Sequence, residues 1–225
     1  MPISGNGSGS KRLIVYDLDG TLVDTRKDIA QAANQMRAAM RLPPLPEKEI
    51  CGYVGLGLNK LVEGCLGTAD PAVVEQGTRV YRAHYTEHLL DNTALYLGAA
   101  EVLEHFRSRG QAVITNKPDP YSRRILEALG VAGYFLEIVP GNSRWPKKPD
   151  PASLLDLMRR EGVSSEEVLF VGDSPIDVET GTRAGVATVA LAQGFSDREE
   201  LMRAAPAHLL DGFPELLRLA KEKGW

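Results

Sequence analysis

Five short apolar runs, rich in β-branched residues, alternate along the chain with segments of helical periodicity. The runs are RLIVY at 12–16, QAVIT at 111–115, FLEIVP at 135–140, EVLFVG at 167–172 and VATVAL at 186–191. Their length and composition predict buried strands. Strands that alternate with helices favour a parallel sheet with helices on both faces, so we expect an α/β fold.

Turn and capping signals mark the helices between these runs. GAAEVLEHFRSRG at 98–110 and YSRRILEALG at 121–130 each end on a glycine, which is typical of a helix C-terminus. SSEE at 164–167 and SDRE at 196–199 have the spacing of capping boxes, in which two side chains satisfy the first free amides of a helix. The two glycines are therefore expected to mark helix ends, and the two boxes to mark helix starts.

About ninety residues without a convincing strand separate the first two runs, whereas an ordinary crossover needs only about a dozen. Thr25 and Asp28 have capping-box spacing, and the apolar residues from Ile29 to Met40 then follow the helical period until LPPLP ends the pattern. GLNKLVEGCLG and PAVVEQGTRVYRAHYTEHLL continue it. We predict a Rossmann-like core with an inserted α-helical cap, divided as follows: disordered tail 1–10, core 11–24 and 96–225, cap 25–95.

Polar residues follow the predicted strands at the edge where a parallel sheet binds its ligands. Asp17 and Asp19 come directly after the first strand, where two like charges are costly unless a cation or a reaction uses them. The later strand ends and loops supply a hydroxyl, an amide, a lysine and further acids: Thr115, Asn116, Lys148, Asp173, Ser174 and Asp177. Such a set suits a divalent metal beside a phosphoryl group.

Four segments resemble the four motifs of the haloacid dehalogenase superfamily of phosphohydrolases, in the same order and spacing. They are DLDGTLVDT, VITNK, KKPDP and VGDSPIDVETG. The similarity spans nearly the whole chain from Lys11. Because a helical insert that contains YVGLGLNKLVEGCLG directly follows the first motif, the chain is most similar to the phosphoglycolate phosphatase branch.

The resemblance implies that Asp17 is the nucleophile that attacks phosphorus and forms an aspartyl-phosphate. Asp19 is implied to be the acid and base that protonates the leaving group and later activates water. The implied cofactor is Mg²⁺, held by the Asp17 carboxylate, the Asp19 backbone carbonyl and Asp173. Ser174 and Asp177 are expected in the shell around these ligands.

The same resemblance implies how the phosphoryl group is bound. Thr115 and the backbone amide of Asn116 are expected to bind its oxygens, and Lys148 to neutralise charge on the nucleophile and the transferring group. Gly20 is also expected at the substrate. The implied substrate is a small phosphorylated metabolite, with 2-phosphoglycolate as the best candidate.

GLGLNK at 55–60 places two glycines just before a helical pattern. Backbone amides near Gly57 and the Lys60 ammonium are therefore candidates for binding a second anionic group of the substrate. Alternatively, the glycines only separate two helices, with Lys60 in solvent.

Other functions stay open at this point. One alternative is a related phosphatase or phosphomutase that acts on a sugar phosphate, a nucleotide or pyrophosphate, although such mutases tend to have valine where Thr21 stands. A different class, the non-enzymatic phospho-aspartyl signalling module, also combines acids, Mg²⁺, a threonine and a lysine. Its receiver domains are near half this length, lack a cap and carry the phosphorylated aspartate on a later strand.

Charge and hydropathy exclude two classes of partner. The formal net charge is -4 with acids and bases interspersed, so the chain lacks the basic stripe of a nucleic-acid-binding protein. No apolar run approaches the ~20 residues of a membrane span, and no signal-peptide pattern is present. We expect a cytoplasmic enzyme, and the sequence carries no signal for its oligomeric state.

Two further patterns favour packing over chemistry. Cys51 and Cys65 form no CxxC pair and have no neighbouring histidine, so we expect them to pack as small apolar residues. His84 and His88 in HYTEH match the inverted zinc-protease pattern. They lie beside the apolar stripe of a predicted helix, which favours half-buried packing histidines, with a zinc site as the alternative.

Overall fold

The computed structural model describes residues 10–225, so the tail expected at 1–10 lies outside the described residues except for its last one. A sheet of six parallel strands forms the core in the order β5-β4-β1-β6-β7-β8. The strands are β1 (Leu13–Tyr16), β4 (Gly110–Ile114), β5 (Glu137–Val139), β6 (Val168–Gly172), β7 (Ala187–Leu191) and β8 (His208–Leu210). The five predicted strands are confirmed, and the edge strand β8 is an addition.

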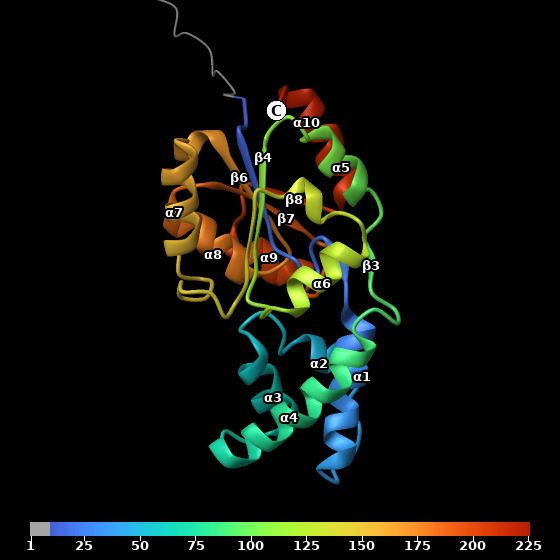
Figure 1. The fold of residues 1–225 in the computed structure, drawn as a ribbon. Coiled ribbons are helices and arrows are strands. Elements are labelled where there is room, and N and C mark those ends of the chain that lie inside the picture. The colour runs from blue at the N-terminus through green and yellow to red at the C-terminus, as the bar shows by residue number, and fades with distance from the viewer. Residues whose placement is uncertain (1–9) are drawn as a thin grey trace, which may run out of the picture.

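Helices cover both faces of this sheet, as predicted (Figure 1). Alternate residues of β1 point to opposite faces, as its extended backbone requires. Ile14 and Tyr16 pack with one layer of helices, and Leu13 and Val15 pack with the other. The first layer is α5 (Ala99–His105), α6 (Tyr121–Ala128) and α10 (Phe213–Lys223). The second layer is α7 (Ala152–Glu161), α8 (Pro175–Ala184) and α9 (Arg198–Ala204).

A group of four helices lies beyond the carboxyl ends of the strands (Figure 1). We call it the cap; it consists of α1 (Arg26–Ala39), α2 (Glu47–Cys51), α3 (Leu58–Leu66) and α4 (Pro71–His88). The two segments that join it to the core pair antiparallel as β2 (Val23–Asp24) and β3 (Ala94–Leu95). Division of the chain at residues 25 and 95 remains our proposal.

Several predicted helix ends differ in the structure. Thr25 precedes α1 but makes no side-chain cap, because its hydroxyl donates to Asp19. Asp197 precedes α9 and also makes no side-chain cap, so the predicted box at 196–199 is wrong. Gly110 opens β4 and does not end α5. In contrast, Gly130 follows α6 with a φ of 72°, and the box at 164–167 is present on the 3₁₀ helix η2 (Ser165–Glu167).

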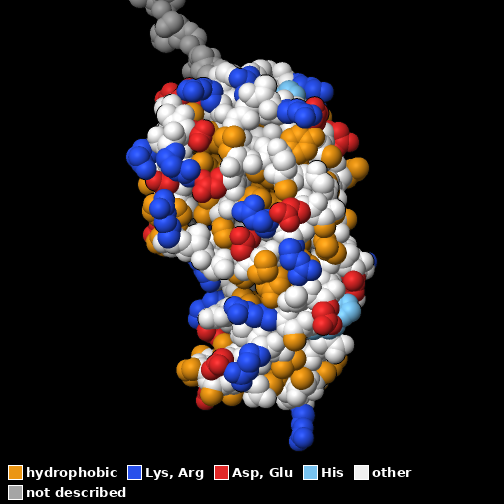
Figure 2. All heavy atoms as spheres, viewed as in Figure 1, with side chains coloured by type: hydrophobic (Ala, Val, Ile, Leu, Met, Phe, Trp, Pro, Cys, Tyr) orange, Lys and Arg blue, Asp and Glu red, His pale blue; other side chains and the backbone are white. Residues whose placement is uncertain are grey.

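The molecule narrows between the core and the cap, and charges of both signs are interspersed on the face shown in Figure 2. Across residues 10–225, no helix combines the length and the apolar character needed to cross a membrane. Cys51 and Cys65 are both free and buried, as predicted. A short 3₁₀ helix, η1 (Ala132–Tyr134), completes the described elements.

A buried carboxylate ties the first cap helix to the chain that returns to the core. Asp28, on α1, is 1% exposed. Its oxygens accept hydrogen bonds from the backbone amides of Asn92 and Thr93 and from both of their side chains, at 2.8–3.1 Å. A hydrogen bond to a buried charge contributes more to the free energy of unfolding than a neutral one does. These bonds should therefore stabilise the connection between the cap and the core.

We therefore predict that Asp28→Asn lowers the free energy of unfolding by about 2 kcal/mol, because an amide NH₂ would face these donors. Denaturant unfolding measures the change. Glu75→Gln is the matched control, since its pair with Arg79 joins two side chains that are 72% and 67% exposed and should change stability by less than about 0.5 kcal/mol. Equal losses in the two variants would contradict this account.

Candidate active site

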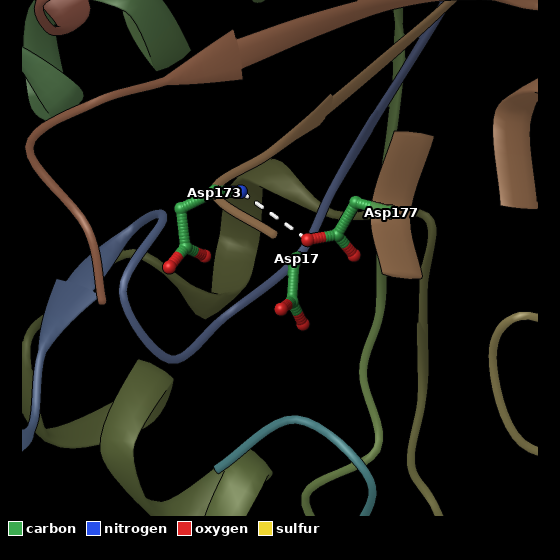
Figure 3. A group of neighbouring side chains, drawn as sticks. All are labelled: Asp17, Asp173 and Asp177. Carbon is green, nitrogen blue, oxygen red and sulfur yellow. Dashed lines mark hydrogen bonds between the residues drawn. The ribbon is translucent and has the colours of Figure 1, made fainter. Parts of the chain in front are cut away.

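Three buried aspartates meet at the carboxyl edge of the sheet (Figure 3). Asp17 follows the central strand β1, Asp173 follows its neighbour β6, and Asp177 lies in the first turn of α8. One carboxylate oxygen of each lies within 4.8 Å of one such oxygen of the other two. The sheet order explains this meeting, because neighbouring parallel strands end at the same edge.

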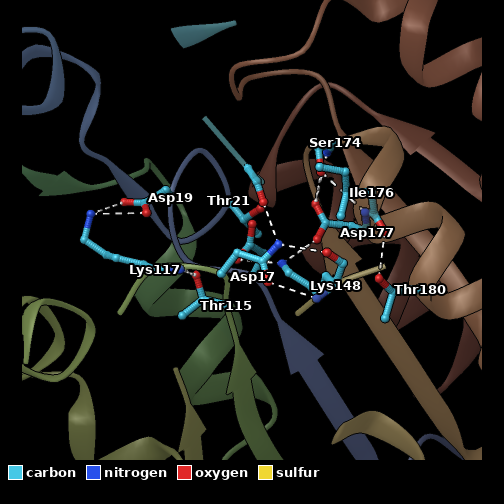
Figure 4. Close-up of polar contacts among 12 residues, drawn as sticks. Asp17, Asp19, Thr21, Thr115, Lys117, Lys148, Ser174, Ile176, Asp177 and Thr180 are labelled. Carbon is cyan, nitrogen blue, oxygen red and sulfur yellow. Dashed lines mark hydrogen bonds and ion pairs between the residues drawn. The ribbon is translucent and has the colours of Figure 1, made fainter. Parts of the chain in front are cut away.

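Lys148 is the cation inside this cluster (Figure 4). Its ammonium lies 2.8 Å from Asp17 Oδ1 and 2.6 Å from Asp177 Oδ1, and its side chain is only 2% exposed. The contact with Asp17 is an ion pair without a well-directed hydrogen bond, so Asp17 Oδ1 is buried with no hydrogen-bond donor aimed at it. One ammonium therefore contacts two of the three carboxylates.

The pKa values of the cluster reflect this imbalance. Burial raises the pKa of Asp17 to about 6, because Lys148 offsets only part of the desolvation and of the repulsion from Asp177. Burial, then repulsion from Asp177 and Asp17, raises the pKa of Asp173 well above its usual range. Burial alone would lower the pKa of Lys148, but the two carboxylates beside it raise it. An additional cation would relieve the excess negative charge.

The donor set fits a divalent metal held by Asp17 and Asp173. Asp173 accepts one hydrogen bond on each oxygen, from the Thr21 hydroxyl at 2.7 Å and from the Phe195 amide at 2.9 Å, which fixes the carboxylate and leaves lone pairs for a ligand bond. Asp177 is already engaged by Lys148 and by both Ser174 donors. Asp177 would therefore lie beside the ligands and hold them in place, and the roles expected for it and for Ser174 stay predictions.

Two glycines let the chain approach Asp173 closely. A Cβ on Gly20 would lie 2.2 Å from Asp173 Oδ2, and a Cβ on Gly194 would lie 2.3 Å from the same atom. Gly20 also has a φ of 82°, which side chains rarely adopt. Gly20 thus makes room for Asp173, and the expectation that it binds substrate stays a prediction.

The residues that follow β4 lie beside the cluster. Thr115 and Asn116 are both buried and line the same cavity, of about 180 Å³, as Asp17 and Asp173. The Asn116 side chain accepts from the Lys148 amide at 2.9 Å and donates to the carbonyls of Lys148 and of Gly55, at 2.9 and 2.6 Å. It therefore holds the Lys148 loop and the cap loop together.

Asp19 lines this cavity on the other side of Asp17 (Figure 4). Its Oδ1 accepts from the Thr25 hydroxyl at 2.7 Å and from the Lys117 ammonium at 2.9 Å, and its Oδ2 lies 3.2 Å from the same ammonium. Lys117 and Thr21 contact the site residues Asp19 and Asp173, and the sequence did not predict these contacts. The signal in the sequence was their position in VITNK and DLDGT, beside predicted site residues.

Gly57 lines the cavity, but Lys60 does not. The Lys60 side chain is 60% exposed, and its ammonium pairs with Glu63 at 2.5 Å on the same helix. Helical spacing explains the correction, because residues three positions apart meet on the helix surface and Lys60 there turns to Glu63. This arrangement agrees with the alternative interpretation, in which Lys60 lies in solvent.

The two histidines of HYTEH lie on α4, with ring centroids 4.3 Å apart. Nδ1 of His88 contacts Asp91 at 2.8 Å. Among residues 10–225, the aspartate cluster is the only group of three or more potential metal ligands found, so the histidines lack the further ligands that a zinc site needs.

Comparisons with known proteins agree with this fold. A model of the haloacid dehalogenase-like hydrolase family matches residues 14–191. A phosphoglycolate phosphatase of Pseudomonas syringae is 35% identical over 92% of this chain and 78% of its own length. One of Haemophilus influenzae is 34% identical over 92% and 97%. The crystal structure of a predicted phosphoglycolate phosphatase from Haemophilus somnus superposes with a TM-score of 0.88 at 29% identity, over 93% of this chain and 98% of that one.

If the aspartates hold a divalent metal, Mg²⁺ should stabilise the folded chain. At a concentration about 100 times its Kd, it should raise the free energy of unfolding by about 2.7 kcal/mol. Thermal unfolding with and without MgCl₂ measures this. Asp173→Asn should abolish the shift, whereas Asp91→Asn, which removes a half-exposed carboxylate of the cap, should keep it. An unchanged shift in Asp173→Asn would contradict the assigned site.

Proposed function

The chain belongs to the haloacid dehalogenase-like hydrolase family and is a phosphoric monoester hydrolase, and we propose that it hydrolyses 2-phosphoglycolate to glycolate and phosphate through an aspartyl-phosphate. The observation that carries the proposal is the contact between Asp17 and Lys148 at the cavity. Asp17 is a buried carboxylate whose Oδ1 lies 2.8 Å from the Lys148 ammonium and accepts no well-directed hydrogen bond, so it is poised as a nucleophile.

In the first step, a carboxylate oxygen of Asp17 forms a bond to phosphorus, and the bond from phosphorus to the ester oxygen breaks. The leaving oxygen takes a proton from Asp19, whose carboxyl group lines the same cavity. The Lys148 ammonium stabilises negative charge on the transferring group. Thr115, which also lines the cavity, donates its hydroxyl to a phosphoryl oxygen.

In the second step, Asp19 takes a proton from a water molecule, and the water oxygen bonds to phosphorus. The bond between phosphorus and the Asp17 oxygen breaks, which restores the carboxylate and releases inorganic phosphate. Asp19 ends the cycle protonated, ready for the next leaving group. The net reaction consumes one water molecule and needs no oxidant or reductant.

Mg²⁺ is the cofactor that we propose for the aspartate cluster. The Asp17 carboxylate, the Asp19 backbone carbonyl and Asp173 would hold it. It supplies a positive charge that offsets repulsion between the nucleophile and the phosphoryl oxygens. Asp177 then accepts from the Lys148 ammonium and, at 3.2 Å, from the Asp173 amide, while the Ser174 hydroxyl holds Asp177 in place.

Two observations support 2-phosphoglycolate as the substrate. The named relatives at 34–35% identity are phosphoglycolate phosphatases. The cavity, at about 180 Å³, is smaller than the roughly 300–1,000 Å³ of ordinary small-molecule sites, which favours a short phosphate ester.

The test is a panel of phosphate monoesters assayed with Mg²⁺. We expect kcat/KM for 2-phosphoglycolate to exceed that for sugar phosphates, nucleotides and pyrophosphate by about 10-fold or more. Asp17→Asn is the control for contaminating phosphatases, and it should lose about 10³-fold or more of kcat while its melting temperature is retained. A higher kcat/KM for a sugar phosphate would overturn the substrate, and an active Asp17→Asn enzyme would overturn the mechanism.

Asp19→Ala separates formation of the aspartyl-phosphate from its hydrolysis. With 4-nitrophenyl phosphate, whose leaving group needs little protonation, the variant should release a burst of nitrophenol of about one equivalent per enzyme and then turn over slowly, because no base activates water. Rapid-quench kinetics measure the burst. Turnover at the original rate without a burst would show that Asp19 is not the acid and base.

A further inference from the structure

Lys117 supplies the only ammonium or guanidinium among the described residues that line the active-site cavity. Its side chain is 6% exposed. Lys148 contacts Asp17 but does not itself line the cavity. Lys60 lies on the surface of α3, where it pairs with Glu63. A second anionic group on a substrate therefore meets one cation in this cavity, and that cation is Lys117.

The Lys117 ammonium is held between the core and the cap. It contacts Asp19 at 2.9 Å and donates to the Tyr85 hydroxyl of α4 at 2.7 Å, while lying 4.7 Å from the centre of the Tyr85 ring. Tyr85 is fixed in turn by stacking on Tyr81 and by an edge contact with Tyr121. Because these tyrosines hold the Lys117 ammonium in place, the charge is preorganised for binding.

The position of Lys117 suits a carboxylate next to the ester carbon. Asp19 is the proposed proton donor to the leaving oxygen, and the Lys117 ammonium is a single hydrogen bond away from it. A carboxylate one carbon beyond that oxygen lies within reach of the ammonium. Asp19 also keeps its hydrogen bond from Thr25, so it retains a partner when the ammonium turns toward the substrate.

The other described residues that line the cavity offer no cation for an anion, although the Lys147 ammonium lies against Gly57, one of the lining residues. The cap side of the cavity carries apolar side chains, and its carboxylates repel an anion. The apolar residues are Ile29, Val54, Leu58 and Leu61, and the acids are Asp17, Asp19, Asp173 and Glu200.

We propose that Lys117 binds the second anionic group of the substrate, so that the site selects short phosphate esters with a carboxylate beside the ester carbon. This inference rests on the proposed phosphatase function. It assigns the charge selectivity to the loop after β4, and not to the cap residue Lys60.

The test compares 2-phosphoglycolate with 2-phosphoglycolamide, which has the same length and no carboxylate charge. The native enzyme should prefer the acid in kcat/KM by about 10-fold or more. Lys117→Gln keeps hydrogen-bond donors for Asp19 and removes the charge. It should lose about 10-fold or more on the acid and less than about 3-fold on the amide, which abolishes the preference.

Three further variants sharpen the comparison. Lys117→Met keeps the apolar stem and should behave like Lys117→Gln, so that misfolding of one variant leaves the other to decide. Lys48→Gln makes the same change in net charge on α2, where the side chain is 85% exposed, and should keep the preference. Lys60→Gln removes the charge that the sequence suggested as the anion-binding group, and it should also keep the preference for the acid.

The outcomes separate the two proposals. A native enzyme that prefers the acid while both Lys117 variants keep that preference overturns the role of Lys117 and leaves the proposed function standing. Equal losses on both substrates also overturn it, because Lys117 would then act through Asp19. A native enzyme that hydrolyses the two substrates equally well overturns the role of Lys117 and leaves the proposed function standing, whereas one that hydrolyses neither overturns both proposals.

Discussion

The structure depends on burying three carboxylates and one ammonium where the central strands end. Charges are costly to bury unless partners satisfy them, and here each has a specific one. This requirement fixes the local chain: Gly20 and Gly194 have no side chain because Asp173 occupies that space. The parallel sheet order brings the loops after β1 and β6 together, and the loop that carries Lys148 closes over them.

The cap takes part in this arrangement through polar contacts with the core loops. Asn116 donates to the Gly55 carbonyl, and Lys117 joins Asp19 to Tyr85. Each contact links a residue after a core strand to a residue of the cap. The position of the cap and the geometry of the site are therefore coupled, which gives a physical route by which a bound substrate would hold the two parts together.

The sequence predicted the features that depend on local pattern. The five strands and the cap helices follow from apolar periodicity, and the order of the motifs at strand ends located Asp17 and Asp173. It did not predict features that depend on partners distant in the chain. Thr25 donates to Asp19 and does not cap its helix. The sequence around Lys117 does not show that Tyr85, from a distant part of the chain, covers this lysine. The strands β2 and β3 have two residues each, too few for a period to appear.

If Asp17 accepts the phosphoryl group, the covalent intermediate can be located in the chain by mapping the phosphorylated residue. Rapid acid quenching during turnover, borohydride reduction and peptide mass analysis would convert an aspartyl-phosphate to homoserine at its own position. With Asp17 as the nucleophile, we expect homoserine at residue 17 and unmodified aspartate at residues 19, 173 and 177. Homoserine at one of those three residues, or phosphate on a histidine or serine, would contradict it.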